Sequence, residues 1–480
     1  MGEAGDRVPR AGALLAALSL ALVWGCAGRP PEERGRAEAG PEQAPARDVL
    51  GHDRSDTSDA PAAGDARGAT EKTAELSAGT SSGSSNEMSG GTGASSDDVP
   101  AAAAGAPLPS PRPMPAGYLA FARACEPGER IVVAAVGDLL LHHELQIQAT
   151  SAKQRFRVLW ENVEDLLAAA DLSYANLEVP LAAGVLRSGE EVTDPGLVFD
   201  RKVYTAYPRF NVHPSLALDL VASGIDVVST ANNHALDRGA LGVDKTLAAL
   251  DAAKLPHTGT RARGKDGPWH AVTKAGSFTV AWLACTLHTN MIADEAGQVL
   301  RCFDSPTAVA DAVRALARTP GIDAVIVTPH WGKEYAPTAT KQQTEFARRW
   351  AEAGATAIVG NHPHVLQPWE SMTTTDGREV LVAYSLGNFV SHQPELPKRS
   401  TAILYFGLGR AAKGPAFVTG AGYVPVHVRQ TGDEFFAEAI DRVGGPADSR
   451  AHIVANFGAA NLLAADKPIE VTPQCRPRRE

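Results

Sequence analysis

The first quarter of the chain lacks the residues from which a hydrophobic core is built. Residues 27–117 contain no phenylalanine, tyrosine, tryptophan or isoleucine, and the segment is rich in alanine, glycine, serine, proline and acidic residues instead. Such a composition cannot bury enough apolar surface to offset the entropy of ordering. The sequence therefore predicts a disordered tether over residues 27–117, with a root-mean-square span of about 50 Å.

The chain also lacks an excess of positive charge. Its 480 residues include 45 lysines and arginines against 55 aspartates and glutamates, for a formal net charge of −10. A broad nucleic-acid-binding surface needs the opposite balance, so nucleic acid is not an expected partner.

The apolar run at the N-terminus is too short to span a bilayer comfortably. Arg7 and Arg10 precede the run at residues 11–24, which is followed by Gly25 and Cys26. This pattern resembles a bacterial lipoprotein signal, in which the cysteine is acylated and becomes the mature N-terminus. An ordinary cleaved signal and a short membrane anchor are the alternatives. All three place the rest of the chain outside the cytoplasm, and we expect a membrane-anchored lipoprotein with residues 1–26 as its signal.

Cysteine is scarce, with five residues in the chain. If Cys26 carries lipid, four remain in an exported protein, where oxidation is expected. Cys285 and Cys302 flank one loop, whereas Cys125 and Cys475 lie near the two ends of the foldable part, and domain ends are often close together. We predict the disulfides Cys285–Cys302 and Cys125–Cys475; four unpaired buried thiols are the alternative.

From about residue 118 onward, apolar strand-like runs alternate with helical segments. This order predicts the α/β class with a substantial sheet. Three later runs have no helix between them, so we expect them to pair antiparallel. The expected strands are residues 131–136, 172–175, 225–230, 278–283, 322–327, 357–359, 379–383, 402–408, 416–418 and 423–428. The expected helices are residues 158–170, 211–223, 241–253, 308–317 and 342–353.

Polar residues that could bind metal follow five of these apolar runs. Each one alone could be a turn or cap residue, but six of them after five strands are expected to converge on one rim of the sheet. A mixture of carboxylate, amide oxygen and imidazole suits Mn²⁺, Fe or Zn²⁺. The set is too large for one tetrahedral site, so we predict two divalent ions about 4 Å apart that activate water. The six residues are Asp138, Glu178, Asn233, His330, His362 and His364.

The same positions carry a family resemblance that covers roughly residues 131–428. The motifs, in chain order, are Gly137-Asp138, Asn176-Leu177-Glu178, Asn232-Asn233-His234, His330-Trp331-Gly332 with Glu334-Tyr335, Gly360-x-His362-Pro363-His364 and Ser385-Leu386-Gly387-Asn388-Phe389. Together they resemble the capsule-synthesis protein A family, which is associated with poly-γ-glutamate capsule production. That family is similar in fold to calcineurin-like metallophosphatases. The resemblance implies a four-layer-like sandwich, with mixed central sheets and helices on the outer faces.

The resemblance also implies roles for individual residues. Asp138 and His364 match ligands of a first metal, and Glu178 matches the bridging carboxylate. Asn233, His330 and His362 match ligands of the second metal. His234 matches the histidine that protonates the leaving group or binds the phosphate in the phosphatases.

The sequence departs from the phosphatase pattern at three positions. Leu140 replaces a histidine of the first motif, although His142 and His143 follow it; Glu178 replaces an aspartate; and Asn361 replaces a histidine often seen in the family. The first two changes leave single-metal occupancy or a different reaction open.

Three further residues are candidates for substrate binding, namely Glu334, Tyr335 and Asn388. Glu334 could instead orient His330 from behind, and Asn388, like Ser385, could be structural.

Two functions are compatible with these observations. The first is a metal-dependent hydrolase of phosphoester or polymer bonds in the cell envelope, with His234 as the catalytic residue. The second is a non-catalytic, metal-stabilised accessory protein that binds or anchors an exported anionic polymer. A capsule ligase and export subunits are the expected partners, besides the membrane itself. The domain organisation expected from the sequence ends with the metallophosphatase-like domain at residues 118–440 and a C-terminal extension at residues 441–480.

Overall fold

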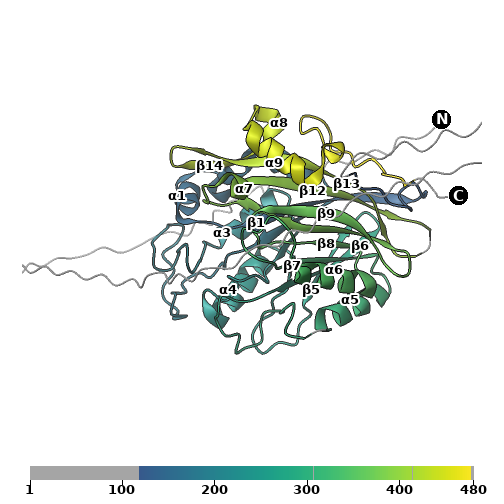
Figure 1. Cartoon of the computed structure of the whole chain (residues 1–480). Coiled ribbons are helices and arrows are strands. Elements are labelled where there is room, and N and C mark those ends of the chain that lie inside the picture. The colour runs from purple at the N-terminus through teal and green to yellow at the C-terminus, as the bar shows by residue number, and fades with distance from the viewer. Residues whose placement is uncertain (1–117, 306, 413, 477–480) are drawn as a thin grey trace, which may run out of the picture. The chain divides into compact units, whose positions relative to one another are not determined.

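The computed structural model describes residues 118–476, except for residues 306 and 413 (Figure 1). The expected signal segment with Cys26 and the expected tether at residues 27–117 lie outside the described residues, as do residues 477–480. Across residues 118–476, apart from the two gaps, no helix has the length and apolar character needed to cross a bilayer.

The first sheet has eight strands, with β1 near its centre. Its order is β14-β13-β12-β1-β2-β3-β4, and β11 pairs with the end of β1. The run β1-β2-β3-β4 is parallel, whereas β12, β13 and β14 are antiparallel. The antiparallel pairing predicted for the rear strands is therefore confirmed. The bounds are β1 Glu129–Leu139, β2 Leu172–Leu177, β3 Val227–Ser229, β4 His257–Thr258, β11 Asn388–Val390, β12 Ser400–Arg410, β13 Phe417–Thr431 and β14 Glu434–Ala439.

The second sheet has six strands in the order β5-β6-β7-β8-β10-β9. Its four inner strands are parallel, and the edge strands β5 and β9 pair antiparallel with their neighbours. Both sheets are therefore mixed. The bounds are β5 His270–Ala275, β6 Phe278–Thr286, β7 Ala324–His330, β8 Ala357–Val359, β9 Leu366–Thr373 and β10 Glu379–Leu386.

Strand β1 shows how the sequence places a layer on each side of a sheet. Ile131, Val133 and Ala135 face the core shared with the second sheet. Ala134 and Val136 point the other way, into the core beneath the helices. Because both faces are buried, the strand reads as a continuous apolar run rather than as an alternation of apolar and polar residues.

Helices cover the outer face of each sheet, which gives four layers (Figure 1). The helices α1, α2, α3 and α4 pack on the first sheet, and α5 and α6 pack on the second. The predicted α/β sandwich with mixed sheets and outer helices is therefore confirmed. The bounds are α1 His143–Ser151, η1 Arg155–Leu159, η2 Glu161–Val163, α2 Glu164–Ala168, α3 Ser215–Ala222, α4 Gly239–Ala252, α5 Ala308–Arg318, α6 Lys341–Ala353, α7 Leu396–Arg399, α8 Ile440–Val443, α9 Ala447–Phe457 and η3 Ala459–Asn461.

Two local predictions differ from the structure. The helix expected over residues 158–170 is a series of short turns, η1, η2 and α2. The strands expected at residues 416–418 and 423–428 form the single strand β13. Gly420 and Gly422 do not interrupt it, because the returning C-terminal segment packs directly against both glycines and leaves no room for a side chain.

The C-terminal segment is part of the same core as the rest of the described chain. Ile453 and Phe457 of α9 pack into the core between the sheets. The backbone N–H of Phe121 donates to the Gln474 carbonyl at 2.8 Å, which ties the two ends together. The hydrophobic core therefore continues past the boundary expected at residue 440.

Both predicted disulfides are present. Cys125 is bonded to Cys475 with 5.6 Å between their Cα atoms. Cys285 is bonded to Cys302 with 5.0 Å between their Cα atoms, and closes the loop between β6 and α5.

Candidate metal centre

The six predicted ligands meet where strand ends from both sheets come together. Asp138, Glu178 and Asn233 lie at or just after the ends of β1, β2 and β3 in the first sheet. His330 ends β7 and His362 follows β8 in the second sheet, together with His364. All six side chains are buried. The prediction that they converge on one rim of a single sheet is wrong, because the site is assembled from the rims of two stacked sheets.

Four donor atoms surround one point at the second predicted metal position. The Nε2 atom of His330 lies 2.9 Å from Asn233 Oδ1 and 3.0 Å from His362 Nδ1. It lies 3.3 Å from Glu178 Oε1. An amide oxygen, a carboxylate and two imidazole nitrogens at this spacing form a suitable donor set for a divalent transition metal.

The first predicted metal position is built around Asp138 and His364. Asp138 Oδ2 lies 3.1 Å from His364 Nδ1, and His364 Nε2 lies 3.9 Å from Glu178 Oε1. In each of two triads, one donor atom per residue lies within 4.8 Å of the others; the triads are Glu178, His362 and His364, and Asp138, Glu178 and His330. Glu178 belongs to both triads, and each triad combines one residue predicted for the first metal with one predicted for the second.

Glu178 is buried, and its carboxylate has ion-pair contacts only with the imidazoles of His330 at 3.3 Å and His364 at 3.9 Å among the described residues. Neither carboxylate oxygen accepts a hydrogen bond from any of the described residues. Burial, followed by the nearby charges of Asp138, Glu334 and Asp237, raises the pKa of Glu178 well above its ordinary value. A buried carboxylate without donors is costly unless a cation neutralises it. The residues present therefore fit a metal centre.

The pKa values of two histidines of the site are shifted in the opposite direction to that of Glu178. Burial lowers the pKa of His330 and of His362 well below the ordinary value, and neighbouring imidazoles, His364 among them, lower both further. Neutral imidazoles are the form that ligates metal.

The His-Pro-His segment brings both of its imidazoles into one group with Glu178. The expectation that the two rings serve different metal ions stays a prediction. The rings of His362 and His364 have centroids 6.0 Å apart and planes at 55°. Both residues have left-handed backbone angles, with φ of 101° for His362 and 59° for His364. Such angles are strained for residues with a side chain and concentrate at functional sites.

Two glycines allow the strand ends to approach one another. A Cβ on Gly137, immediately before Asp138, would collide with the carbonyl oxygen of Gly387. A Cβ on Gly360, immediately before Asn361, would collide with the carbonyl oxygen of Tyr384. Both motif glycines are therefore required by close backbone contact beside the site.

The predicted metal ligands are supported by a layer of hydrogen bonds that was not expected from the sequence. Asn176 Nδ2 donates to Asp138 Oδ1 at 2.7 Å and lies 3.2 Å from His330 Nδ1, so it joins the two metal positions. Ser229 Oγ donates to Asn176 Oδ1 at 2.7 Å and fixes that amide. Asn176 was visible in the Asn176-Leu177-Glu178 motif, but its contacts depend on the packing of separate strands.

Asn388 is fully buried and lies against His364 rather than in the open cleft. Its Oδ1 is 2.9 Å from His364 Nδ1, and its Nδ2 donates to the Lys398 carbonyl at 3.0 Å. This geometry suits a residue that orients a metal ligand. The expected contact of Asn388 with substrate stays a prediction.

His234 does not belong to either triad and is held by a carboxylate. Its Nδ1 lies 2.8 Å from Asp237 Oδ2, which also accepts the backbone N–H of Phe210 at 2.6 Å. The ring of Phe210 meets the His234 ring edge-on at 4.7 Å between centroids. A carboxylate at Nδ1 leaves Nε2 free to face the cleft, which is the arrangement of a proton-transferring histidine. Asp237 was not predicted to belong to the site.

An open cleft of about 450 Å³ lies above the metal positions, with Asn233, His234 and His364 on its floor. Glu334 and Tyr335 line one wall, where a substrate contact was predicted. Burial and Glu334 together raise the pKa of Tyr335 to about 12, so its hydroxyl stays a hydrogen-bond donor.

The sequence pattern of one protein family matches more than half of the chain. It is described as bacterial capsule synthesis protein PGA_cap, and the match covers residues 132–393. The chain belongs to this family.

Two Bacillus proteins illustrate the family. A capsule biosynthesis protein CapA of Bacillus anthracis is 25% identical over 321 residues, which cover 65% of this chain and 71% of that protein. A PGA biosynthesis protein CapA of Bacillus subtilis is 31% identical over 200 residues, which cover 40% of this chain and 50% of that protein. This family member therefore spans only about half the length of the Bacillus subtilis relative.

Solved structures are similar at a more distant level. A hypothetical protein from Thermus thermophilus aligns with a TM-score of 0.35 at 15% identity and covers 62% of this chain and 99% of that one. The NAD nucleotidase of Haemophilus influenzae aligns with a TM-score of 0.39 at 12% identity and covers 70% of this chain and 57% of that one.

In this family member, the histidine expected in the first phosphatase motif has no substitute among its sequence neighbours. Leu140 is buried in the core beneath the helices. His142 reaches the cleft, but its Nδ1 lies 3.1 Å from the Leu140 carbonyl, and burial lowers its pKa to about 4. His143 instead lies 2.9 Å from Glu144. The first predicted metal position therefore has fewer candidate protein donors than the second.

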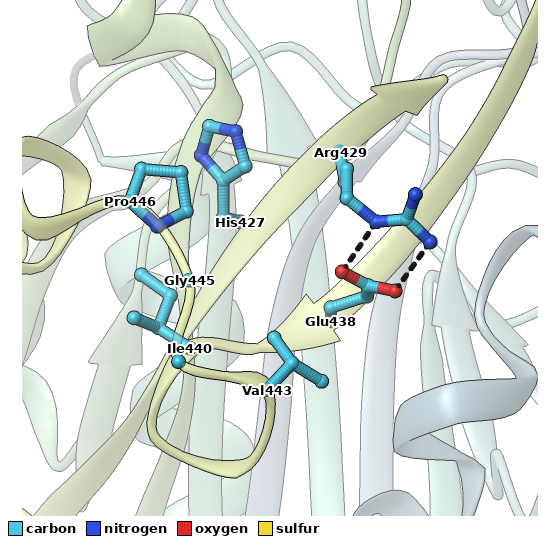
Figure 2. Close-up of a pocket in the computed structure, with 8 residues that line it drawn as sticks. His427, Arg429, Glu438, Ile440, Val443, Gly445 and Pro446 are labelled. Carbon is cyan, nitrogen blue, oxygen red and sulfur yellow. Dashed lines mark hydrogen bonds and ion pairs between the residues drawn. The ribbon is translucent and has the colours of Figure 1, made fainter.

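A separate pocket of about 530 Å³ lies beside α8 and carries no comparable cluster (Figure 2). Its charged residues, Arg429 and Glu438, are paired with each other through two contacts of 2.7 and 2.8 Å. With its charges already paired, this pocket does not compete with the metal centre as a functional site.

Proposed function

We propose that this protein is a metal-dependent hydrolase of the cell envelope, acting on a phosphoester or on an amide-linked polymer. One observation carries the proposal: the buried Glu178 carboxylate lacks hydrogen-bond donors among the described residues and belongs to both ligand triads. Two divalent ions, Mn²⁺, Fe or Zn²⁺, would activate water and stabilise developing negative charge when bound there.

The roles of the protein residues follow from the geometry. Asp138 and His364 would hold one ion and Asn233, His330 and His362 would hold the other, with Glu178 within reach of both sets. In phosphoester hydrolysis, the oxygen of water bonds to phosphorus, and the bond to the leaving oxygen breaks with its electron pair on that oxygen. His234 donates a proton to the leaving oxygen, and the proton released by water returns the imidazole to its starting state.

Family membership supports a role in capsule or poly-γ-glutamate synthesis. The relatives are named for capsule and PGA biosynthesis, and a 29%-identical Mycobacterium tuberculosis relative is named a probable polyglutamine synthesis accessory protein. An anionic envelope polymer is thus a candidate substrate, with a capsule ligase and export subunits as partners. Fold alone does not decide the reaction.

A non-catalytic accessory role is the second candidate, and Leu140 favours it. An apolar side chain where the phosphatases place a histidine leaves the first metal position short of a ligand. A protein with one structural metal could bind or anchor an exported polymer without cleaving it.

Metal analysis of the full chain separates these possibilities. We expect bound divalent metal in the wild type and at least roughly 10-fold weaker binding in Glu178→Gln, which keeps the shape but removes the charge. The Glu178→Gln protein should unfold at no lower temperature than the metal-free wild type, because an uncompensated buried charge is gone. Glu345→Gln, on the exposed face of α6, is the matched control.

Hydrolysis is measured on the same proteins with a phosphomonoester, a phosphodiester and γ-linked polyglutamate. Turnover that disappears in Glu178→Gln supports the hydrolase. Metal binding without turnover of any substrate favours the accessory role, and wild-type protein without metal contradicts both.

For localisation, we propose a lipid anchor on Cys26 and a position on the outer side of the membrane. Gly25 directly before Cys26, after a short apolar run, supports this proposal. Cys26→Ala should move the protein from the membrane fraction to the soluble fraction, as followed by fractionation and mass spectrometry of the N-terminal peptide. Unchanged membrane attachment of Cys26→Ala would indicate an uncleaved anchor instead.

A further inference from the structure

The mouth of the cleft above the metal centre is rimmed by exposed apolar side chains. Tyr207 is 74% exposed, Tyr335 is 46% exposed and Met291 is fully exposed, and all three line this cleft. Large apolar side chains gathered around a polar floor indicate a binding surface rather than ordinary surface composition.

The loop that carries Met291 is held in place by a disulfide and by hydrogen bonds, one of them to Asn233 at the base of the cleft. The Cys285–Cys302 disulfide closes the base of its loop, and Arg301 Nη2 donates to the Leu287 carbonyl at 2.8 Å. Next to Met291, the Asn290 side chain accepts a hydrogen bond from Asn233 Nδ2 at 3.3 Å. The Met291 side chain is therefore presented to the cleft by an anchored loop.

The two other walls are fixed as well. Phe210, three residues after Tyr207, is fully buried against His234. The backbone N–H of Tyr335 donates to the Pro363 carbonyl at 2.8 Å, and Lys398 Nζ lies 3.9 Å from the centre of its ring. The rim is thus organised before any ligand binds, which lowers the entropic cost of binding.

The fixed charges of the cleft do not suit a long polyanion. Arg209 is the one arginine or lysine among the residues that line it in the described part of the chain. Glu334 and Asp237 contribute two carboxylates to the same lining. A polymer with a carboxylate on every unit would meet repulsion here beyond the metal positions.

We infer that the cleft is a subsite for a compact ligand with one anionic reacting group and a flat apolar substituent. The anionic group lies on the floor beside His234, and the substituent is held between Tyr207 and Met291, with Tyr335 on the third side. This inference rests on the metal centre of the proposed function, because bound ions would attract the anionic group, but it does not require hydrolysis.

Calorimetry on the full chain with bound metal tests the subsite by binding alone. Phenylphosphonate and methylphosphonate share the anionic group and differ in the apolar substituent. We expect phenylphosphonate to bind about 5- to 10-fold more tightly, the size of one aromatic contact. Tyr207→Ser and Met291→Ser should each weaken phenylphosphonate and leave methylphosphonate unchanged. Val272→Ser is the matched control, since Val272 is 42% exposed on β5 and does not line this cleft.

The outcomes separate this subsite from the hydrolase. The subsite would be overturned by equal affinities for the two phosphonates or by equal effects of the rim variants on both. Binding of γ-linked polyglutamate without binding of either phosphonate would also overturn it. Phenyl-selective binding in a protein that hydrolyses nothing would retain the subsite and overturn the hydrolase. If the protein hydrolyses phenyl phosphate and the rim variants leave the rate unchanged, the hydrolase is retained and the subsite is overturned.

Discussion

At the scale of single residues, the candidate metal centre combines buried polar groups that are unfavourable unless a cation binds to them. The buried carboxylate of Glu178 accepts no hydrogen bond from the described residues. Burial and neighbouring imidazoles lower the pKa values of His330 and His362. Each feature alone would destabilise the fold. Their coincidence within a few ångströms is what makes the metal interpretation stronger than that of a polar turn.

His234 is the residue whose role can be separated from metal binding. It contacts Asp237 and belongs to neither ligand triad. His234→Ala should leave metal content unchanged and lower any hydrolytic rate by at least roughly 10²-fold, the size of a general-acid contribution. Metal analysis and steady-state kinetics on the same preparation measure both quantities.

His270→Ala, on the edge strand β5, is the matched control for this experiment. A parallel loss of metal in His234→Ala would make His234 a ligand and would contradict its role as an acid.

At the scale of elements, helix α9 is attached to the sheet by a buried polar cluster. His427 Nδ1 lies 3.0 Å from Ser449 Oγ, and Ser449 Oγ lies 2.8 Å from Ser400 Oγ. The three residues come from β13, α9 and β12. His427 lines the pocket beside α8, next to Arg429 and Glu438 (Figure 2).

The attachment of α9 should weaken in acid. Burial, and secondly Arg399, lowers the pKa of His427 from 6.5 to about 4, against the smaller opposite effect of Glu438. A histidine with a lowered folded-state pKa stabilises the fold above pH 6.5, and this contribution is lost as the pH falls from 6.5 towards 4. Thermal unfolding across this range should therefore show a steeper loss of stability for the wild type than for His427→Asn.

His143→Asn serves as the control, because its imidazole is 41% exposed. Parallel pH profiles for the wild type and His427→Asn would show that His427 does not contribute.

At the scale of the whole described chain, one disulfide joins its two ends. Cys125 and Cys475 are 350 positions apart, whereas Cys285 and Cys302 are 17 apart. In the chain-entropy account, the longer loop contributes more, about 6 kcal/mol against about 3 kcal/mol. Urea unfolding should thus show a larger loss for Cys475→Ser than for Cys302→Ser. The reverse order would mean that local packing, and not chain entropy, sets the contribution.

The same two disulfides have different functional consequences. Cys302→Ser releases the loop that carries Asn290 and Met291 beside the metal centre, whereas Cys475→Ser acts on the far side of the core between the sheets. Cleft binding should therefore respond to Cys302→Ser even where the loss of stability is small.

The sequence by itself determined the features that follow from local pattern. Apolar runs such as residues 131–136 identified buried strands, and the histidines on either side of Pro363 indicated where the buried cluster of His, Asp and Glu side chains lies. The order of strands and helices predicted the α/β class, because secondary structure depends chiefly on neighbouring residues. Counting cysteines near the ends of the foldable part was enough to pair Cys125 with Cys475.

Only the tertiary structure decided how these elements meet. The ligands come from two sheets because β1, β2 and β3 and the strands β7 and β8 join different hydrogen-bonded ladders, a choice that no local pattern records. Asn176 and Asn388 acquired their contacts in the same way, through strands and loops far apart in the chain. Strand β13 runs through two glycines because a distant segment packs on them, and packing of this kind is a property of the folded whole.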